Sequence, residues 1–183
     1  MTCAAGPAWR DRVADTGRSC RMARTVHRGP YATRMLALKL WRASMWCHRH
    51  GLRRTSRVFK SILFLAFGAL LEPEVTLEGH VNFAHRGLGV VIHGSTVLGD
   101  WVQIWQYATI GSTNDKHKPN TGVRVGRGVV IGPHAIIICT NDRTLTIGDG
   151  AVIAAGAIVV DDVPAGALVL PQPSRIIPGG ATG

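Results

Sequence analysis

The chain has 183 residues, of which 46% are hydrophobic and 17% charged, and its formal net charge is +10 at pH 7. This length supports one ordinary domain, and the apolar content is too high for a chain that is disordered throughout. Residues 1–60 contain 14 Lys and Arg against two acids, whereas residues 61–183 contain seven against nine. The asymmetry assigns the excess charge to an N-terminal tail or helical collar and argues against a domain-wide nucleic-acid binder.

The cysteines, the apolar runs and the N-terminus indicate a cytoplasmic protein. Cys3, Cys20, Cys47 and Cys139 are scattered without metal-ligand or CxxC spacing, so neither a disulfide scaffold nor a zinc module is expected. The longest apolar run, residues 61–71, is about half of what a membrane-spanning helix requires. The N-terminus also lacks the apolar core of a secretory leader.

The first 70 residues divide into two parts. Residues 1–33 have no sustained period and are expected to form a flexible basic extension. In residues 34–70, apolar and basic side chains recur at helical spacing on both sides of His50-Gly51, which predicts a short basic α-helical hairpin. The basic faces allow peripheral contact with an anionic membrane surface, and a simple solvated face is the alternative.

After this region a six-residue period begins and continues to residue 163. An aliphatic or aromatic residue recurs in steps of six at Leu71, Leu77, Phe83, Ile92, Leu98, Ile104, Ile110, Val125, Ile131, Ile137, Ile147, Ile153 and Val159. Four residues after each of these anchors, ten of the thirteen positions hold Ala, Val or Thr. An α-helix needs a period near 3.6 and a sandwich has looser spacing, so the pattern predicts a triangular solenoid. We expect a parallel β-helix of about four coils.

The period breaks at three places, where extra chain is expected to project from a corner. These segments lie between the anchors Phe83 and Ile92, Ile110 and Val125, and Ile137 and Ile147, with the third insertion expected at residues 141–144. Projecting loops on a repetitive scaffold commonly carry function.

The six-residue period over residues 71–163, together with residues 84–92 and 104–111, resembles the hexapeptide-repeat acyltransferase superfamily, in its serine acetyltransferase-like branch. Residues 84–92 are similar to the branch's His-x-x-Gly-Val-Val-Val segment, and residues 104–111 to its Gln-x-Val-Thr-Leu-Gly stretch. Residues 116–119 stand where the branch has Arg-His-Pro, and residues 173–177 look like its closing Pro-Ala-Arg-Ile segment. The resemblance implies a left-handed parallel β-helix over residues 71–177, followed by a flexible tail at 178–183.

The activity implied by the resemblance is acetyl transfer from acetyl-CoA to a hydroxyl group, without a metal. An imidazole can take the proton of the hydroxyl and return it to the departing thiolate. His85 matches the catalytic base of the branch. Acceptor-binding positions are expected at His117, Lys116 and Gln106.

Acetyl-CoA binding in this superfamily follows the groove between neighbouring β-helices of a homotrimer. By resemblance, Arg175 contacts the phosphates of CoA, and Gly132, Ala154 and Ala155 are small residues along the pantetheine arm. Small-molecule or glycan acceptors, and no nucleic acid, are the expected partners.

The sequence also departs from serine acetyltransferases. Ala84 stands where an acid precedes the catalytic histidine, and Leu70 stands at an earlier acidic position, for which Glu72 or Glu74 could substitute. The acceptor therefore stays open between serine and a sugar, polysaccharide or natural-product hydroxyl.

Two other functions are open alternatives. A γ-carbonic-anhydrase-like zinc protein would use His80, His85 and His117. A nucleic-acid-binding or scaffold protein would use residues 1–60.

Overall fold

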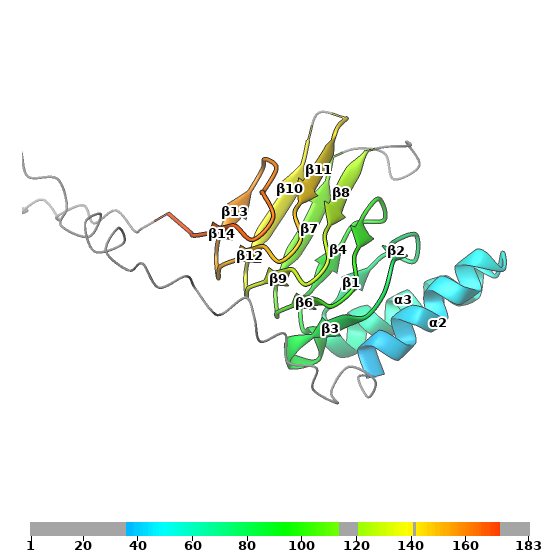
Figure 1. Cartoon of the computed structure of the whole chain (residues 1–183). Coiled ribbons are helices and arrows are strands. Elements are labelled where there is room, and N and C mark those ends of the chain that lie inside the picture. The colour runs from blue at the N-terminus through cyan, green and yellow to red at the C-terminus, as the bar shows by residue number, and fades with distance from the viewer. Residues whose placement is uncertain (1–35, 114–120, 141, 173–183) are drawn as a thin grey trace, which may run out of the picture.

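The computed structural model describes residues 36–113, 121–140 and 142–172 of the chain. Two helices come first and are followed by short strands that wind into a single β-helix (Figure 1). None of the helices in these described ranges is long and apolar enough to cross a bilayer.

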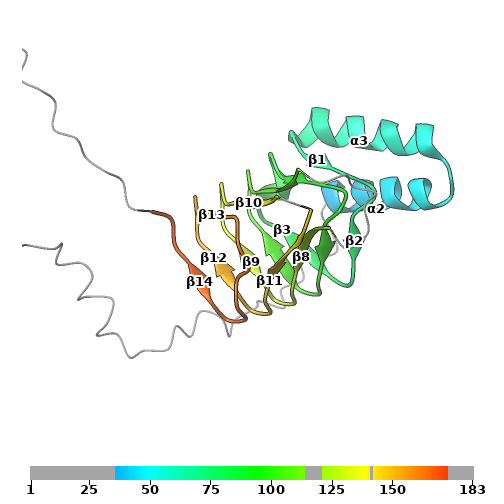
Figure 2. The same ribbon diagram turned by 90° about the horizontal axis from the view of Figure 1, so that it is seen from above.

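The helices α2 (Leu36–Arg49) and α3 (Arg53–Phe67) pack against each other as an antiparallel hairpin. Helix α3 ends at Gly68, whose left-handed backbone allows its N–H to bond the carbonyls of the last turn. The buried Trp41 of α2 donates its indole N–H to the carbonyl of Glu72 at 2.9 Å, and its ring lies 5.8 Å from that of Phe83. The hairpin thus lies at the first-coil end of the β-helix (Figures 1 and 2). The two helices confirm the predicted α-helical hairpin.

The strands form three parallel sheets, here called A, B and C. Sheet A contains β1 (Leu70–Leu71), β4 (Val91–Ile92), β7 (Thr109–Ser112), β10 (Ile136–Cys139) and β13 (Ile158–Val159). Sheet B contains β2 (Thr76–Leu77), β5 (Val97–Leu98), β8 (Gly122–Val125) and β11 (Thr144–Ile147). Sheet C contains β3 (Val81–Phe83), β6 (Val102–Ile104), β9 (Val130–Ile131), β12 (Val152–Ile153) and β14 (Leu168–Val169).

The chain visits the sheets in the order A, B, C and then returns to A one level along the axis. Four complete coils result, followed by a fifth in which Val163 makes an isolated parallel bridge to Ile147 (Figure 2). This is the parallel β-helix predicted from the hexapeptide period, with the left hand that the family resemblance implied. The three sheets form the walls of a three-sided prism, and each edge of the prism is named after the two sheets that it joins. Sheet A therefore lies between the C–A edge and the A–B edge.

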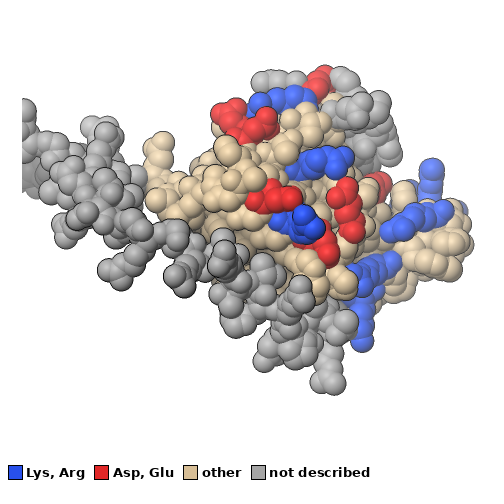
Figure 3. All heavy atoms as spheres, viewed as in Figure 1, with Lys and Arg blue, Asp and Glu red and all other residues tan. Residues whose placement is uncertain are grey.

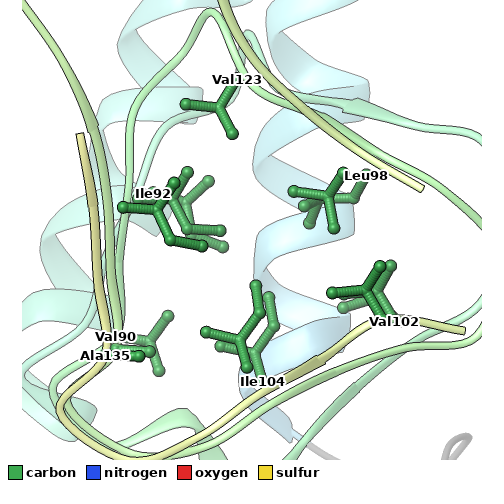
Figure 4. Packing of buried hydrophobic residues seen from close by; sticks show 14 of the residues in the cluster. Val90, Ile92, Leu98, Val102, Ile104, Val123 and Ala135 are labelled. Atoms are coloured by element: carbon green, nitrogen blue, oxygen red, sulfur yellow. The ribbon is translucent and has the colours of Figure 1, made fainter. Parts of the chain in front are cut away.

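The period determines what fills the prism. In Figure 4 the labelled side chains, among them Ile92, Leu98 and Ile104, point inward from the three walls toward one another. All thirteen anchors are buried except Leu77, which is partly exposed and packs against the same core. Because parallel strands of successive coils align anchor with anchor, the aliphatic side chains form continuous interior columns.

The three breaks in the period fall on two different edges. The first is the 3-10 turn η3 (Ala84–Gly87) on the C–A edge. The second and third fall between β7 and β8 and between β10 and β11, at the A–B edge (Figure 1). The described residues beside these breaks extend the pairing of the strands to Cys139↔Ser112 and Thr144↔Gly122. Thr144, which we expected within the third insertion, is already the first residue of β11, because its backbone pairs with Gly122.

Candidate active site

The loop that carries His85 has an unusual backbone. His85 and Arg86 have φ values of 48° and 63°, and Gly87 and Gly89 also lie at positive φ. Two successive non-glycine residues in the left-handed region are costly, and such strain persists only where the surroundings impose it. The loop is therefore a position where the fold holds a histidine in one particular orientation.

Contacts from both the hairpin and the next coil hold this loop. The N–H of Gly89 donates to the carbonyl of Phe67 at the end of α3 at 2.9 Å, and the N–H of Tyr107 donates to the carbonyl of Leu88 at 2.9 Å. Gly87 lies against the buried ring of Phe83, which a Cβ on this glycine would meet at 3.3 Å. The hairpin thus fixes the loop as well as closing the end of the core.

The imidazole of His85 is exposed beside an aromatic ring. Its centroid lies 5.8 Å from that of Trp105, which is half-buried one coil further along the C–A edge. Within the described part of the chain, no side-chain hydrogen bond or ion pair orients the imidazole. A base in this position can reach a ligand from the solvent side of the edge.

Within one chain, neither Glu72 nor Glu74 lies on the edge that carries His85. Both follow β1 on the A–B edge, on the opposite side of sheet A from His85. The carboxylate of Glu72 is paired with the ammonium of Lys60 at 2.6 Å. Glu72 therefore belongs to the hairpin contact, and the expectation that it could orient His85 is wrong for a single chain.

The small residues predicted to line the pantetheine arm lie on the same edge as His85. Gly132 follows β9, and its N–H donates to the carbonyl of Ile153 at 2.8 Å. A Cβ on Gly132 would lie 2.7 Å from the backbone nitrogen of Ala155 and 2.9 Å from the carbonyl carbon of Ala154. At this corner the backbones of successive coils therefore lie close together, and only small side chains project from them. Arg175 lies outside the described residues.

Sequence reasoning gave little weight to two aromatic rings on this edge. Tyr107 and His134 occupy equivalent corners of successive coils at φ of 58° and 56°, and their rings stack at 4.9 Å with an interplanar angle of 14°. The coil register could have paired them, because Tyr107 and His134 each stand three residues after an anchor of sheet C, Ile104 or Ile131.

Gln106, predicted to contact the acceptor, lies between Trp105 and Tyr107 on this edge. Its side-chain oxygen is buried and makes no hydrogen bond in the structure. A buried, unpaired oxygen of this kind is costly and is available to a donor on a ligand.

The other acceptor-binding positions, Lys116 and His117, lie outside the described residues. The chain leaves β7 at Ser112 and re-enters the structure before β8, both on the A–B edge. Within one chain, the segment that contains His117 thus begins and ends on the side of sheet A opposite to the loop of His85.

His80 lies on the third edge, between sheets B and C. Its backbone N–H donates to Asp100 at 2.6 Å, its ring nitrogen lies 3.2 Å from the same carboxylate oxygen, and its ring stacks on Trp101 at 4.8 Å. The backbone hydrogen bond from His80 is the main reason that the pKa of Asp100 is lowered from its usual 3.8. His80 and His85 therefore do not converge, and the described residues contain no group of three potential metal ligands.

Comparisons with known proteins agree with this geometry. No protein-family model matches the chain. Serine acetyltransferase 4 of Arabidopsis thaliana is 31% identical over 146 residues, which cover 78% of this chain and 38% of the relative. Serine acetyltransferase of Synechococcus elongatus is 30% identical over 141 residues, which cover 77% of this chain and 55% of the relative.

Solved structures give the same result. The soybean serine acetyltransferase apoenzyme superposes with a TM-score of 0.65 and 27% identity, covering 77% of this chain and 56% of that one. Serine acetyltransferase from Brucella abortus strain S19 superposes with a TM-score of 0.66 and 26% identity, covering 77% of this chain and 55% of that one. The chain therefore spans between about two fifths and just over half the length of these relatives.

The left-handed β-helix, with the loop of His85 on one of its edges, has the fold of the serine acetyltransferases with which it superposes. Within the hexapeptide-repeat acyltransferase superfamily, the relatives place the chain in the serine acetyltransferase family.

Proposed function

We propose that the protein is an O-acetyltransferase that moves the acetyl group of acetyl-CoA to a hydroxyl acceptor. The observation that carries this proposal is the placement of His85, on a constrained loop, along the same edge as the close backbone stack of Gly132 with Ala154 and Ala155. The names of the relatives support acetyl transfer as the reaction.

In the proposed reaction, His85 is the general base. The imidazole takes the proton of the acceptor hydroxyl while the oxygen of that hydroxyl attacks the thioester carbonyl carbon. The tetrahedral intermediate then collapses, the carbon–sulfur bond breaks, and the imidazolium returns the proton to the CoA thiolate. The products are the acetyl ester and free CoA, so neither a metal nor a covalent enzyme intermediate is required.

Acetyl-CoA is the proposed co-substrate, with its pantetheine arm along Gly132, Ala154 and Ala155. Small residues at this corner allow an extended chain to approach the backbone closely. Arg175 is the proposed contact for the CoA phosphates. A corner N–H is the proposed donor to the oxyanion.

The proposed assembly is a homotrimer. The histidine loop and the ends of the His117 segment lie on opposite sides of sheet A, so one chain does not bring them together. The outer face of sheet A also carries exposed apolar side chains, including Ile136 and Ile158. A cyclic trimer would cover this face and unite the two edges across each subunit boundary.

Serine is the acceptor indicated by the names of the relatives. A sugar, polysaccharide or natural-product hydroxyl is the second candidate, and a specific observation favours it. The C–A edge, at residues 84–90, 105–108, 132–135 and 154–157, has no acidic residue to pair with an amine and instead presents Trp105, Tyr107 and His134. Aromatic faces pack well against the apolar faces of sugar or aromatic rings.

The test is thiol release from acetyl-CoA in the presence of serine, homoserine, sugars and other alcohols. We expect His85→Gln to lower kcat by about 10²- to 10⁴-fold, because the base contributes that much to proton transfer. His80→Gln is the matched control, since His80 lies on a different edge, and it should retain wild-type turnover. Full activity of His85→Gln with any acceptor of the panel would contradict the proposal.

A further inference from the structure

The hairpin carries an unbalanced positive charge. Residues 36–71 contain no Asp or Glu and seven cations: Lys39, Arg42, Arg49, Arg53, Arg54, Arg57 and Lys60. Lys60 pairs with Glu72 at 2.6 Å, and the other six have no ion-pair partner among the described residues. On the face drawn in Figure 3, Lys and Arg atoms gather over the end of the molecule where the hairpin lies.

The same hairpin exposes an apolar stripe. Helix α3 buries only Ser56 and Leu63, so most of its circumference faces solvent. Val58, Ile62 and Leu65 follow one another at i, i+4 and i+7 on its outer side, with exposures of 58%, 39% and 83%. Phe64 lies beside this stripe and is 58% exposed. A contiguous exposed stripe of this size on a water-facing helix indicates an interaction surface.

Charge and apolar surface meet in one hollow. A depression of about 590 Å³ is lined by Arg57, Lys60 and Ser61 toward the N-terminal half of α3, and by Phe64, Leu65 and Leu70 toward its C-terminal half. A cationic end beside an apolar wall suits a ligand with an anionic head and a hydrocarbon chain.

We propose that the α2–α3 hairpin docks the protein on an anionic membrane surface, with α3 lying in the plane of the interface. The arginines contact acidic headgroups and the Val58–Ile62–Leu65 stripe enters the headgroup–acyl boundary. A second copy is a poorer partner, because symmetric contact through this surface would bring like charges together. Nucleic acid would use the cations and leave the apolar stripe exposed. The inference does not depend on the acetyl-transfer reaction.

The test is co-sedimentation of the full chain with vesicles of phosphatidylcholine, alone or mixed with phosphatidylglycerol. We expect binding only to the anionic vesicles and weaker binding as salt is raised. Because residues 1–35 contain additional arginines, the contribution of the hairpin is measured as the difference between full-length variants.

The variants separate charge from apolar insertion. Replacing Arg53, Arg54 and Arg57 together with Gln should reduce partitioning by about 100-fold, at roughly fivefold per cation. The pair Val58→Gln and Leu65→Gln should weaken binding at unchanged charge. Matched controls on the β-helix are Arg124→Gln with Arg127→Gln, and Leu168→Gln, all at exposed side chains. These should bind as the wild type does, and thermal unfolding confirms that each variant is folded.

Four outcomes would overturn the proposal. The first is equal sedimentation with neutral and anionic vesicles, or with neither. The second is unchanged vesicle binding by the hairpin variants. The third is a smaller assembly mass of the Val58→Gln, Leu65→Gln protein in sedimentation velocity without a loss of vesicle binding, which would assign the stripe to another copy of the chain. Retention of duplex DNA that only the arginine variant loses, in the absence of vesicle binding, would assign the surface to nucleic acid.

Discussion

Single residues determine how the His85 loop is presented. His85 and Arg86 adopt left-handed backbone angles without being glycine, while the two glycines of the loop, Gly87 and Gly89, follow with φ of 74° and 64°. The position of the histidine was predictable from the motif around residues 84–92. Its backbone strain was not, because it arises from contacts with Phe67, Phe83 and Tyr107, which are distant in sequence.

Gly87→Ala should destabilise the protein more than the same change at Gly128. Both residues have similar positive φ, of +74° and +67°, so both variants carry the left-handed penalty of about 1–2 kcal/mol. At Gly87 the new Cβ also meets the buried Phe83 ring, whereas at Gly128 it meets nothing within 4 Å. Urea unfolding measures the difference, and equal losses at the two positions would show that the ring moves aside freely.

Asp100→Asn should lower stability at neutral pH and leave a smaller difference in acid. The pKa of the Asp100 carboxyl is below its usual 3.8 in the folded state, chiefly through the hydrogen bond from the His80 N–H. Its stabilising contribution is therefore present above about pH 4 and is lost as the pH falls through the lowered folded-state pKa. Unfolding midpoints of both proteins between pH 7 and pH 3 test this, and a difference independent of pH would contradict it.

At the scale of the elements, the six-residue period carries the fold. Each coil buries its anchors, and successive coils pair their backbones in register. The stacked coils were predictable because an aliphatic residue recurs at a constant spacing of six. Short strands wound into a solenoid bury all of these residues on one inner face. The hairpin was predictable as a pair of helices, but its docking through Trp41 depends on tertiary contacts.

Two adjacent residues of β9 test this arrangement. Ile131 points into the prism and is fully buried, whereas Val130 faces outward on sheet C and is half-buried. We expect Ile131→Ala to cost about 2–5 kcal/mol of the free energy of unfolding, through lost burial and the cavity it leaves. Val130→Ala should cost about 1 kcal/mol or less. Chemical denaturation compares them, and similar losses would mean that the two side chains are not segregated between inside and outside.

At the scale of the whole molecule, the proposed site spans two chains. The loop of His85 lies on the C–A edge, while β7 and β8, which flank the segment of His117, meet at the A–B edge. The motifs around the two histidines do not show this separation, but the count of anchors agrees with it, since Phe83 is the third anchor and Ile110 the seventh in a coil of three strands.

Mixing two inactive variants tests the shared site. If His85 and His117 act together across a subunit boundary, co-expressed His85→Ala and His117→Ala chains should form mixed trimers that recover about a quarter of wild-type turnover. Each variant assembled alone should stay inactive. Thiol release from acetyl-CoA measures the recovery, and inactivity of mixed assemblies, with their composition verified by native mass spectrometry, would place both residues in one chain.

The periodicity and local motifs were enough to predict a parallel β-helix of about four coils and a helical hairpin, and to single out the residue proposed as the base. Both kinds of signal act over a few residues. Tertiary contacts were needed to show that Glu72 pairs with Lys60 and that Tyr107 stacks on His134. Those features depend on which residues the winding of the chain brings together from successive coils, and on how the hairpin closes the first of them.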